Sequence, residues 1–249
     1  MPLLRASRIN PIFVGMVERP RLQDFAAHRT RLEEKMGGRY TLALVSTIVA
    51  LIANPLAGNS QVINLFIDLW VFFTLGFLIL SLRSGNFKRL EVILLSSSTM
   101  GMGIANLCRS WLGWDMDLVF LYLLPFAVLF FFHCAWLIVK SVFQEAQVTT
   151  DLLCGVVLAY LLIGIAWVCI YSFIDLTVVD AFSIGADADK RAAFVYFSFV
   201  TLTTLGYGDI LPVAEIARTA AYLQAVTGVM FGAIFVAALV GNWKNPNAK

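Results

Sequence analysis

Long apolar stretches alternate with short polar segments along most of this chain. A membrane-spanning helix needs about 20 mainly apolar residues, because each residue rises about 1.5 Å and the hydrocarbon layer is about 30 Å thick. The stretches of about that length are 39–57, 62–82, 90–109, 117–140, 151–174 and 212–241. We therefore predict an all-α membrane protein with six transmembrane helices.

One further apolar stretch, 192–203, is about 12 residues long and too short to cross a membrane. Irregular backbone at membrane depth is tolerated only where protein buries it or where it lines a water-filled cavity. We therefore interpret this stretch as a re-entrant helix, which leads into an irregular segment. That segment, Thr201 to Asp209, is rich in Thr and Gly and lies between two long apolar stretches.

The composition of this Thr- and Gly-rich segment favours an unusual backbone. Gly206 and Gly208 can adopt backbone angles that are closed to other residues, at little steric cost. A backbone of alternating hand would turn successive carbonyls toward one axis. The carbonyls from Thr204 to Gly208, with the Thr204 hydroxyl, would then form stacked oxygen rings that replace the water shell of a cation. The simpler alternative is a glycine-rich turn between two membrane helices.

The run Thr204-Leu205-Gly206-Tyr207-Gly208-Asp209 resembles the selectivity filter of potassium channels, with Leu where that family often has Val or Ile. The resemblance implies a homotetramer, since the family closes its oxygen rings with four such segments. It implies passive potassium conduction with no catalytic step, so the chain would not be an enzyme and would need no cofactor. The implied filter residues, all but the last also potassium ligands, are Thr204, Leu205, Gly206, Tyr207 and Gly208.

The resemblance also assigns roles to residues around the filter. Asp209 would lie at the outer mouth and Thr203 at the cavity below. Tyr196 and Phe197 fall where the family has an aromatic cuff, and they would pack against Tyr207. The acidic residues expected either to raise the local cation concentration around the mouth or to belong to a solvated loop are Asp175, Asp180, Asp187 and Asp189.

The last span, 212–241, is the expected inner helix of the pore. Pro212 suits the first turn of such a helix, as Thr150 suits the N-cap of the preceding span. Gly228 lies at the spacing from the filter at which the family has a gating hinge. Gly228 and Gly232 would alternatively form a Gly-x-x-x-Gly packing face.

The composition and the charges support a membrane protein with a defined orientation. The chain is 60% hydrophobic and 14% charged, which is too apolar for an ordinary soluble domain. With both termini in the cytoplasm of a multi-pass cell-membrane protein, 14 of the 18 Lys and Arg residues lie inside. The filter then faces outward. The net charge of +2 reflects this topology and is not a footprint for nucleic acid.

The order of the spans predicts a division of the chain into five segments. A cytoplasmic segment, 1–38, precedes a four-helix domain, 39–140, like that of voltage-gated channels. A linker, 141–150, leads to the pore domain, 151–243, and a short tail, 244–249. The fourth span carries no Arg or Lys between Asp117 and Lys140, where voltage-gated relatives carry several. We therefore expect a channel that is not steeply voltage-gated.

Few other polar groups lie within the predicted spans. Asp68 and Arg109 are at similar depth and are expected to pair and tie two helices together. His133 is expected to make a hydrogen-bonded helix contact, with a pH-sensitive role as the alternative. The cysteines, which we expect to be buried and inert, are Cys108, Cys134, Cys154 and Cys169.

Three alternatives remain open from the sequence. A less selective cation channel would follow if Leu205 and the aromatic cuff altered filter rigidity. A secondary transporter would need ionisable groups at one depth, whereas Asp68 and His133 lie roughly 10 Å or more apart along the membrane normal. The run 99–103 faintly resembles a second filter, but the charges around it would open such a loop to the wrong face.

Overall fold

The structure is a computed structural model that describes residues 38–56, 117–144, 149–185 and 188–243, together with a few single positions between 66 and 112. Contacts divide the chain into two units, Met1–Gly38 and Arg39–Lys249. Apart from Gly38, the described residues belong to the second unit. The cytoplasmic segment and the tail predicted from the sequence, together with Asp68, Arg109 and Asp187, lie outside the described residues.

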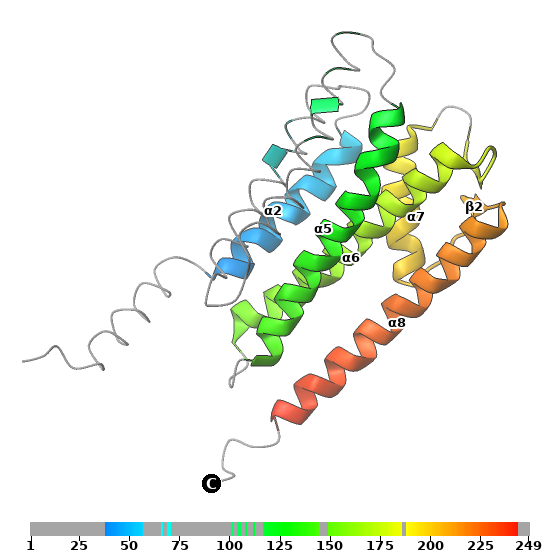
Figure 1. Cartoon of the computed structure of the whole chain (residues 1–249). Helices are drawn as coiled ribbons and strands as arrows, with labels where there is room; N and C mark the ends of the chain where they lie inside the picture. The colour runs from blue at the N-terminus through cyan, green and yellow to red at the C-terminus, as the bar shows by residue number, and fades with distance from the viewer. Residues whose placement is uncertain are drawn as a thin grey trace, which may run out of the picture. The chain divides into compact units, whose positions relative to one another are not determined.

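The described part is almost entirely helical (Figure 1). Three helices are long and apolar enough to cross a membrane, over Asp117–Phe143, Thr150–Thr177 and Glu215–Ala238. A shorter apolar helix covers Tyr40–Asn54. The predicted spans 62–82 and 90–109 fall largely outside the described residues. The helices are α2 (Arg39–Leu56), α5 (Asp117–Gln144), α6 (Thr150–Thr177), α7 (Lys190–Leu202) and α8 (Glu215–Trp243).

Helices α5 and α6 form a tight hairpin that carries most of the core (Figure 1). Small residues on the two helices, such as Ala127 and Ala159, are fully buried and let the helices approach closely. α5 continues to Gln144, so the first four residues of the predicted linker 141–150 are helical. The connection between the two helices is therefore short, which favours antiparallel neighbours.

The N-terminal end of α6 is capped and bound to α2. Thr149 is the N-cap, since its hydroxyl accepts from the Leu152 amide at 3.2 Å. The prediction of Thr150 as the cap was wrong by one residue, because the extended residue that precedes the first helical turn is Thr149. Asp151 accepts from both the amide and the hydroxyl of Thr41, at 2.9 and 3.0 Å, and so ties the starts of α2 and α6 together.

Two short strands bracket the pore-helix region. β1 (Phe182–Ser183) pairs antiparallel with β2 (Leu211–Pro212), with Phe182 opposite Pro212 and Ser183 opposite Leu211. The chain therefore leaves this point before α7 and returns to it after the Thr- and Gly-rich segment. α7, at 13 residues, is too short to cross a membrane, as the length of its apolar stretch predicts.

Pro212 does not begin the inner helix. It lies in β2, and α8 begins three residues later at Glu215. The amides of Val213 and Ala214 donate to the Ala181 carbonyl at 2.8 and 3.2 Å, which holds the turn between β2 and α8. Proline lacks the amide hydrogen that a central strand needs, so a short two-stranded edge accommodates it equally well.

Candidate functional site

The segment after α7 has the alternating backbone that its glycines favour. Gly206 and Gly208 have φ values of +56° and +79°, and Thr204 has +59°. Positive φ is a costly conformation for a β-branched residue such as Thr, and such strain concentrates at functional sites. Sequence reasoning predicted the conformation of the glycines and missed that of Thr204.

The hydrogen bonds of this segment determine where its carbonyls point. The amides of Leu205 and Gly206 both donate to the Val200 carbonyl of α7, at 2.9 and 3.3 Å. In a trans peptide the amide hydrogen and the preceding carbonyl point in opposite directions. The carbonyls of Thr204 and Leu205 therefore both point away from Val200. These two carbonyls thus point the same way, as the predicted oxygen rings require.

The segment is open to one side within a single chain. Every residue from Thr203 to Asp209 is exposed, and the side chains of Leu205 and Tyr207 are 55% and 69% exposed. A Cβ built on Gly206 or Gly208 would have nothing within 4 Å. Within one chain, then, these glycines are required for their positive φ and not for crowding around a Cβ.

The outer end of the segment is bound to α7 through a side chain. The Tyr196 hydroxyl hydrogen-bonds to the Asp209 carboxylate, and this bond raises the pKa of Tyr196 to about 12. Asp209 also accepts from the Ile210 amide at 3.1 Å. Of the two predicted cuff residues, Tyr196 thus contacts the end of the filter-like segment.

Phe197 faces a different environment. Its ring is 6% exposed and packs edge-on against Tyr171 at 4.9 Å and Phe182 at 5.7 Å between ring centroids. The predicted contact with Tyr207 is not among the ring contacts of the described residues. Phe197 instead belongs to an aromatic cluster that fills the space between α6, β1 and α7.

The lower end of α7 is in close contact with α6 and α8. The Leu202 carbonyl accepts from the Tyr160 hydroxyl at 3.2 Å. A Cβ on Gly228 would lie 2.0 Å from that same carbonyl oxygen, whereas one on Gly232 would meet nothing within 4 Å. Gly228 is therefore a close-packing glycine, while Gly232 makes no close contact within the chain. Thr203, the predicted cavity residue, is exposed, and its hydroxyl donates to the Phe199 carbonyl at 2.7 Å.

A buried polar network lies between α6, α7 and α8, and the sequence analysis did not predict it. It joins Tyr171, Gln224 and Ser198, all fully buried. Its one signal in the sequence is a lone Gln in the apolar stretch from Ala220 to Val240.

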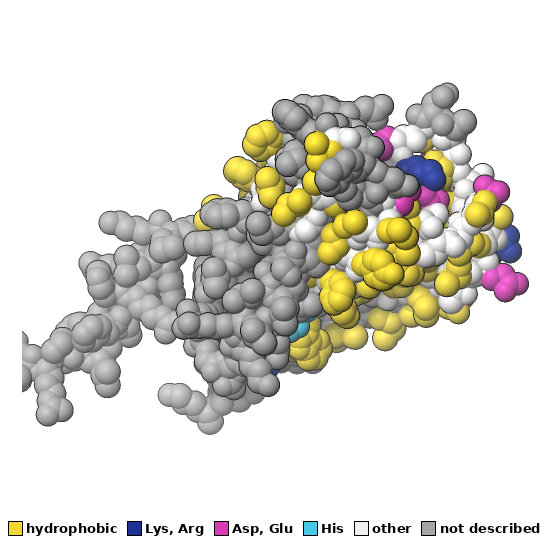
Figure 2. Space-filling view, turned by 45° about the horizontal axis from the view of Figure 1, so that its top comes forward, with side chains coloured by type: hydrophobic (Ala, Val, Ile, Leu, Met, Phe, Trp, Pro, Cys, Tyr) yellow, Lys and Arg dark blue, Asp and Glu magenta, His cyan; other side chains and the backbone are white. Residues whose placement is uncertain are grey.

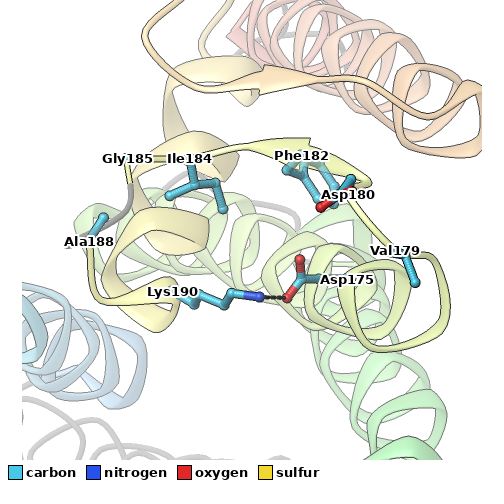
Figure 3. A pocket seen from close by; sticks show the side chains of 8 residues that line it. All are labelled: Asp175, Val179, Asp180, Phe182, Ile184, Gly185, Ala188 and Lys190. Carbon is cyan, nitrogen blue, oxygen red and sulfur yellow. Dashed lines mark hydrogen bonds and ion pairs between the residues drawn. The ribbon is translucent and has the colours of Figure 1, made fainter.

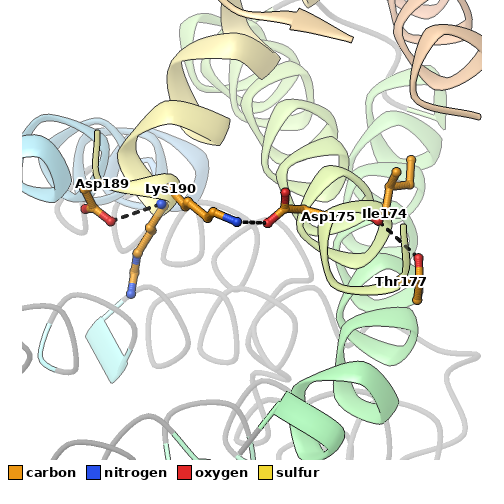
Figure 4. A network of polar contacts seen from close by, with 6 residues as sticks. Ile174, Asp175, Thr177, Asp189 and Lys190 are labelled. Carbon is orange, nitrogen blue, oxygen red and sulfur yellow. Dashed lines mark hydrogen bonds and ion pairs between the residues drawn. The ribbon is translucent and has the colours of Figure 1, made fainter. Parts of the chain in front are cut away.

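Two of the acidic residues expected at the mouth, Asp175 and Asp189, have partners within the chain. A pocket of about 440 Å³ lies beside the C-terminal end of α6 and the N-terminal end of α7. It is lined in part by Asp175, Asp180 and Lys190 (Figure 3). Lys190 forms an ion pair with Asp175 at 2.8 Å, and Asp189 caps α7 by accepting from the Arg191 amide at 3.1 Å (Figure 4). The charge of Asp175 is thus paired with that of Lys190, and Asp189 stabilises the N-terminal end of α7.

The other residues singled out within the predicted spans are His133 and the four cysteines. His133 is partly buried, and its Nε2 has no hydrogen-bond partner among the residues that the structure describes. The expected hydrogen-bonded contact is not seen at that atom. No disulfide joins the four cysteines; Cys134 and Cys169 are buried as expected, whereas Cys108 and Cys154 are only partly buried. The described part holds no cluster of three His, Cys, Asp or Glu side chains suited to a metal ion.

Comparison with known proteins identifies this region. Residues 167–242, which hold α7, the filter-like segment and α8, match the family model described as "Ion channel". These residues therefore resemble an ion channel domain. A two-pore potassium channel 4 from Arabidopsis thaliana is 36% identical over a 97-position alignment that covers 35% of this chain and 31% of that protein. The resemblance to potassium channels is thus confirmed. No solved structure matches the chain.

The family match also bears on whether this region is an enzyme. Channels conduct ions and form or break no covalent bond, so the domain is not an enzyme, and the potassium channel family uses no cofactor. The matched part spans about a third of the potassium channel that it resembles.

Proposed function

We propose that this protein is a potassium-selective channel in which ions pass down their gradient through the segment Thr204–Gly208. The observation that carries the proposal is the alternation of positive φ at Thr204, Gly206 and Gly208, with two amides turned toward Val200. Oxygens aligned in this way replace the hydration shell of a potassium ion.

The working unit that we propose is a homotetramer. One chain supplies one column of carbonyls, and a closed set of rings needs copies related by a rotation axis. Lipid can cover the apolar side chains that α8 exposes, such as Val229 and Ile234, but it cannot satisfy the exposed backbone of the filter. That backbone needs water and neighbouring protein around it. Several chains arranged around a central, water-filled pore would supply both.

The proposed setting is the cell membrane, with six spans and both termini in the cytoplasm. Hydrophobic side chains cover much of the described surface, and most of the visible acidic and basic side chains gather toward one end (Figure 2). The excess of Lys and Arg in the segments that the sequence assigns to the cytoplasm favours a filter that faces outward, by the positive-inside rule.

Ion flux through purified protein in liposomes tests this proposal. A potassium gradient alone is expected to drive flux, and a sodium gradient of the same size is expected to drive much less. Equal fluxes would favour the less selective cation channel. A requirement for a counter-substrate would favour a transporter, and the absence of any flux would overturn the proposal.

A further inference from the structure

The polar network behind α7 joins three helices through one glutamine. Gln224 of α8 accepts from the Tyr171 hydroxyl of α6 through Oε1. Its Nε2 donates to the Ser198 carbonyl at 3.0 Å and to the Ser198 hydroxyl at 2.7 Å. Ser198 Oγ in turn donates to the Gly164 carbonyl of α6 at 2.8 Å. Gln224 is thus the member through which α8 contacts the other two helices.

The network is fully buried and fully bonded. Gln224, Ser198 and Tyr171 are each 0% exposed. A buried amide or hydroxyl is costly to keep away from water unless it is hydrogen-bonded, and here both ends of the Gln224 amide have partners. Such networks specify one arrangement of the helices that they join.

The position of the network relates it to the filter. Ser198 lies two residues before Val200, whose carbonyl accepts from the Leu205 and Gly206 amides. One helical turn after Ser198, the Leu202 carbonyl meets Gly228, which is itself one turn after Gln224. α8 therefore touches α7 at two points, one on each side of the carbonyl that orients the filter.

We propose that Gln224 is a positioning residue for the filter, which transmits the position of the inner helix to the pore helix through Ser198. The inference rests on the proposed potassium channel function. A displacement of α8 at Gln224 shifts Ser198, and with it the Val200 carbonyl that holds the Leu205 and Gly206 amides. Selectivity therefore depends on a residue that does not face the ions.

The test compares variants of the full chain reconstituted in bilayers, with the potassium-to-sodium permeability ratio as the main readout. Gln224→Leu leaves the Tyr171 hydroxyl without its acceptor and removes the donor to Ser198, and the ratio is expected to fall about tenfold, as for the loss of a buried hydrogen-bonded group. Tyr171→Phe keeps the ring in its aromatic cluster and removes one donor, and a smaller fall is expected. Because both variants break one network, the double variant is expected to lose less than the sum.

Gln224→Glu provides a readout that a purely structural role would not move. A protonated carboxyl keeps the acceptor and one of the two donated hydrogen bonds of the amide, while an ionised one has no hydrogen to donate to Ser198. The permeability ratio of this variant is expected to be near that of the parent protein at low pH and to fall as the pH rises.

Thr227→Val is the matched control. Thr227 lies on the same helix, and its hydroxyl donates only to the Leu223 carbonyl of its own helix, at 2.8 Å. Its ratio is expected to stay unchanged. If the parent protein conducts no potassium, the proposed function fails. If the parent is selective and assembled Gln224→Leu and Tyr171→Phe both keep its ratio, the inference about Gln224 is overturned. If Gln224→Leu does not assemble, an unchanged ratio in Tyr171→Phe together with a pH-independent ratio in Gln224→Glu overturns it.

Discussion

At the scale of single residues, the backbone angles of the filter carry more information than its side chains. Three alternate positions, Thr204, Gly206 and Gly208, have positive φ. For a residue with a Cβ the left-handed conformation costs about 1–2 kcal/mol. Thr204 bears this cost, and the two glycines avoid it.

Replacing Gly206 or Gly208 by Ala is expected to abolish selective potassium flux. The added Cβ strains a φ of +56° or +79° in every subunit, which turns the neighbouring carbonyls away from the pore axis. Gly185→Ala is the matched control, because Gly185 has no positive φ and a Cβ there would meet nothing within 4 Å. The measurement is the potassium-to-sodium permeability ratio in bilayers. An unchanged ratio in Gly206→Ala would contradict the assignment of the filter.

The hydrogen bond from Tyr196 to Asp209 predicts a pH dependence at the outer mouth. The bond raises the pKa of Tyr196 from 10.0 to about 12, so its contribution is fully present below pH 10 and is lost as the pH rises through about 12. Asp209→Asn removes the negative charge and is expected to lower the Tyr196 pKa toward 10. The phenolate absorbance of each protein, minus that of its Tyr196→Phe counterpart, measures this pKa. A difference titration that is the same with and without Asp209 would contradict the bond.

At the scale of elements, the architecture holds α7 by both of its ends. The pairing of β1 with β2 brings the chain back to its starting level after the filter. At the other end, the Leu202 carbonyl is covered by Tyr160 and Gly228. A helix of 13 residues cannot span the membrane, so it depends on these neighbours for its position.

Gly228 and Gly232 differ in what surrounds them, and substitution by Ala is expected to separate them. Gly228→Ala would bring a Cβ within 2.0 Å of the Leu202 carbonyl and is expected to destabilise the fold by about 1–3 kcal/mol per subunit, as overpacking does. Gly232→Ala meets no atom and removes an exposed helix-interior glycine, so a gain of roughly 0.5–1 kcal/mol is expected. Thermal unfolding in detergent measures both. Equal effects would show that contact with Leu202 does not limit Gly228.

At the scale of the whole molecule, the described part of one chain would supply one subunit of the proposed pore. The filter-like backbone and much of α8 are exposed, while α5 and α6 carry the core. Assembly as the proposed tetramer in a membrane would cover the long apolar faces and enclose the open segment. It would also decide how Phe197 and Tyr207 of different subunits lie relative to one another.

The channel is expected to respond only weakly to voltage. Moving one charge through 100 mV is worth about 2.3 kcal/mol, and steep gating uses several charges in each subunit. α5 has no Lys or Arg between Asp117 and Lys140, and Asp117 lies at its first turn. Open probability against voltage, in a bilayer with symmetric potassium, is expected to correspond to about one charge or fewer per channel. A steep curve would show that charges outside α5 move in the field.

Sequence alone was enough for features that depend on local composition. The lengths of α5, α6 and α8 follow from apolar stretches, and the re-entrant α7 follows from a stretch too short to cross. The flexibility of Gly206 and Gly208 is a property of glycine itself. These predictions needed no knowledge of which segments lie side by side.

Only the tertiary structure decided the features that depend on contacts between distant segments. Pro212 lies in β2 because Phe182, 30 positions earlier, pairs with it. Phe197 turns toward Tyr171, and Gln224 finds its partners on two other helices. Local pattern cannot predict such pairings, because a buried polar group or a close-packed glycine is stable only where the facing backbone supplies its partner.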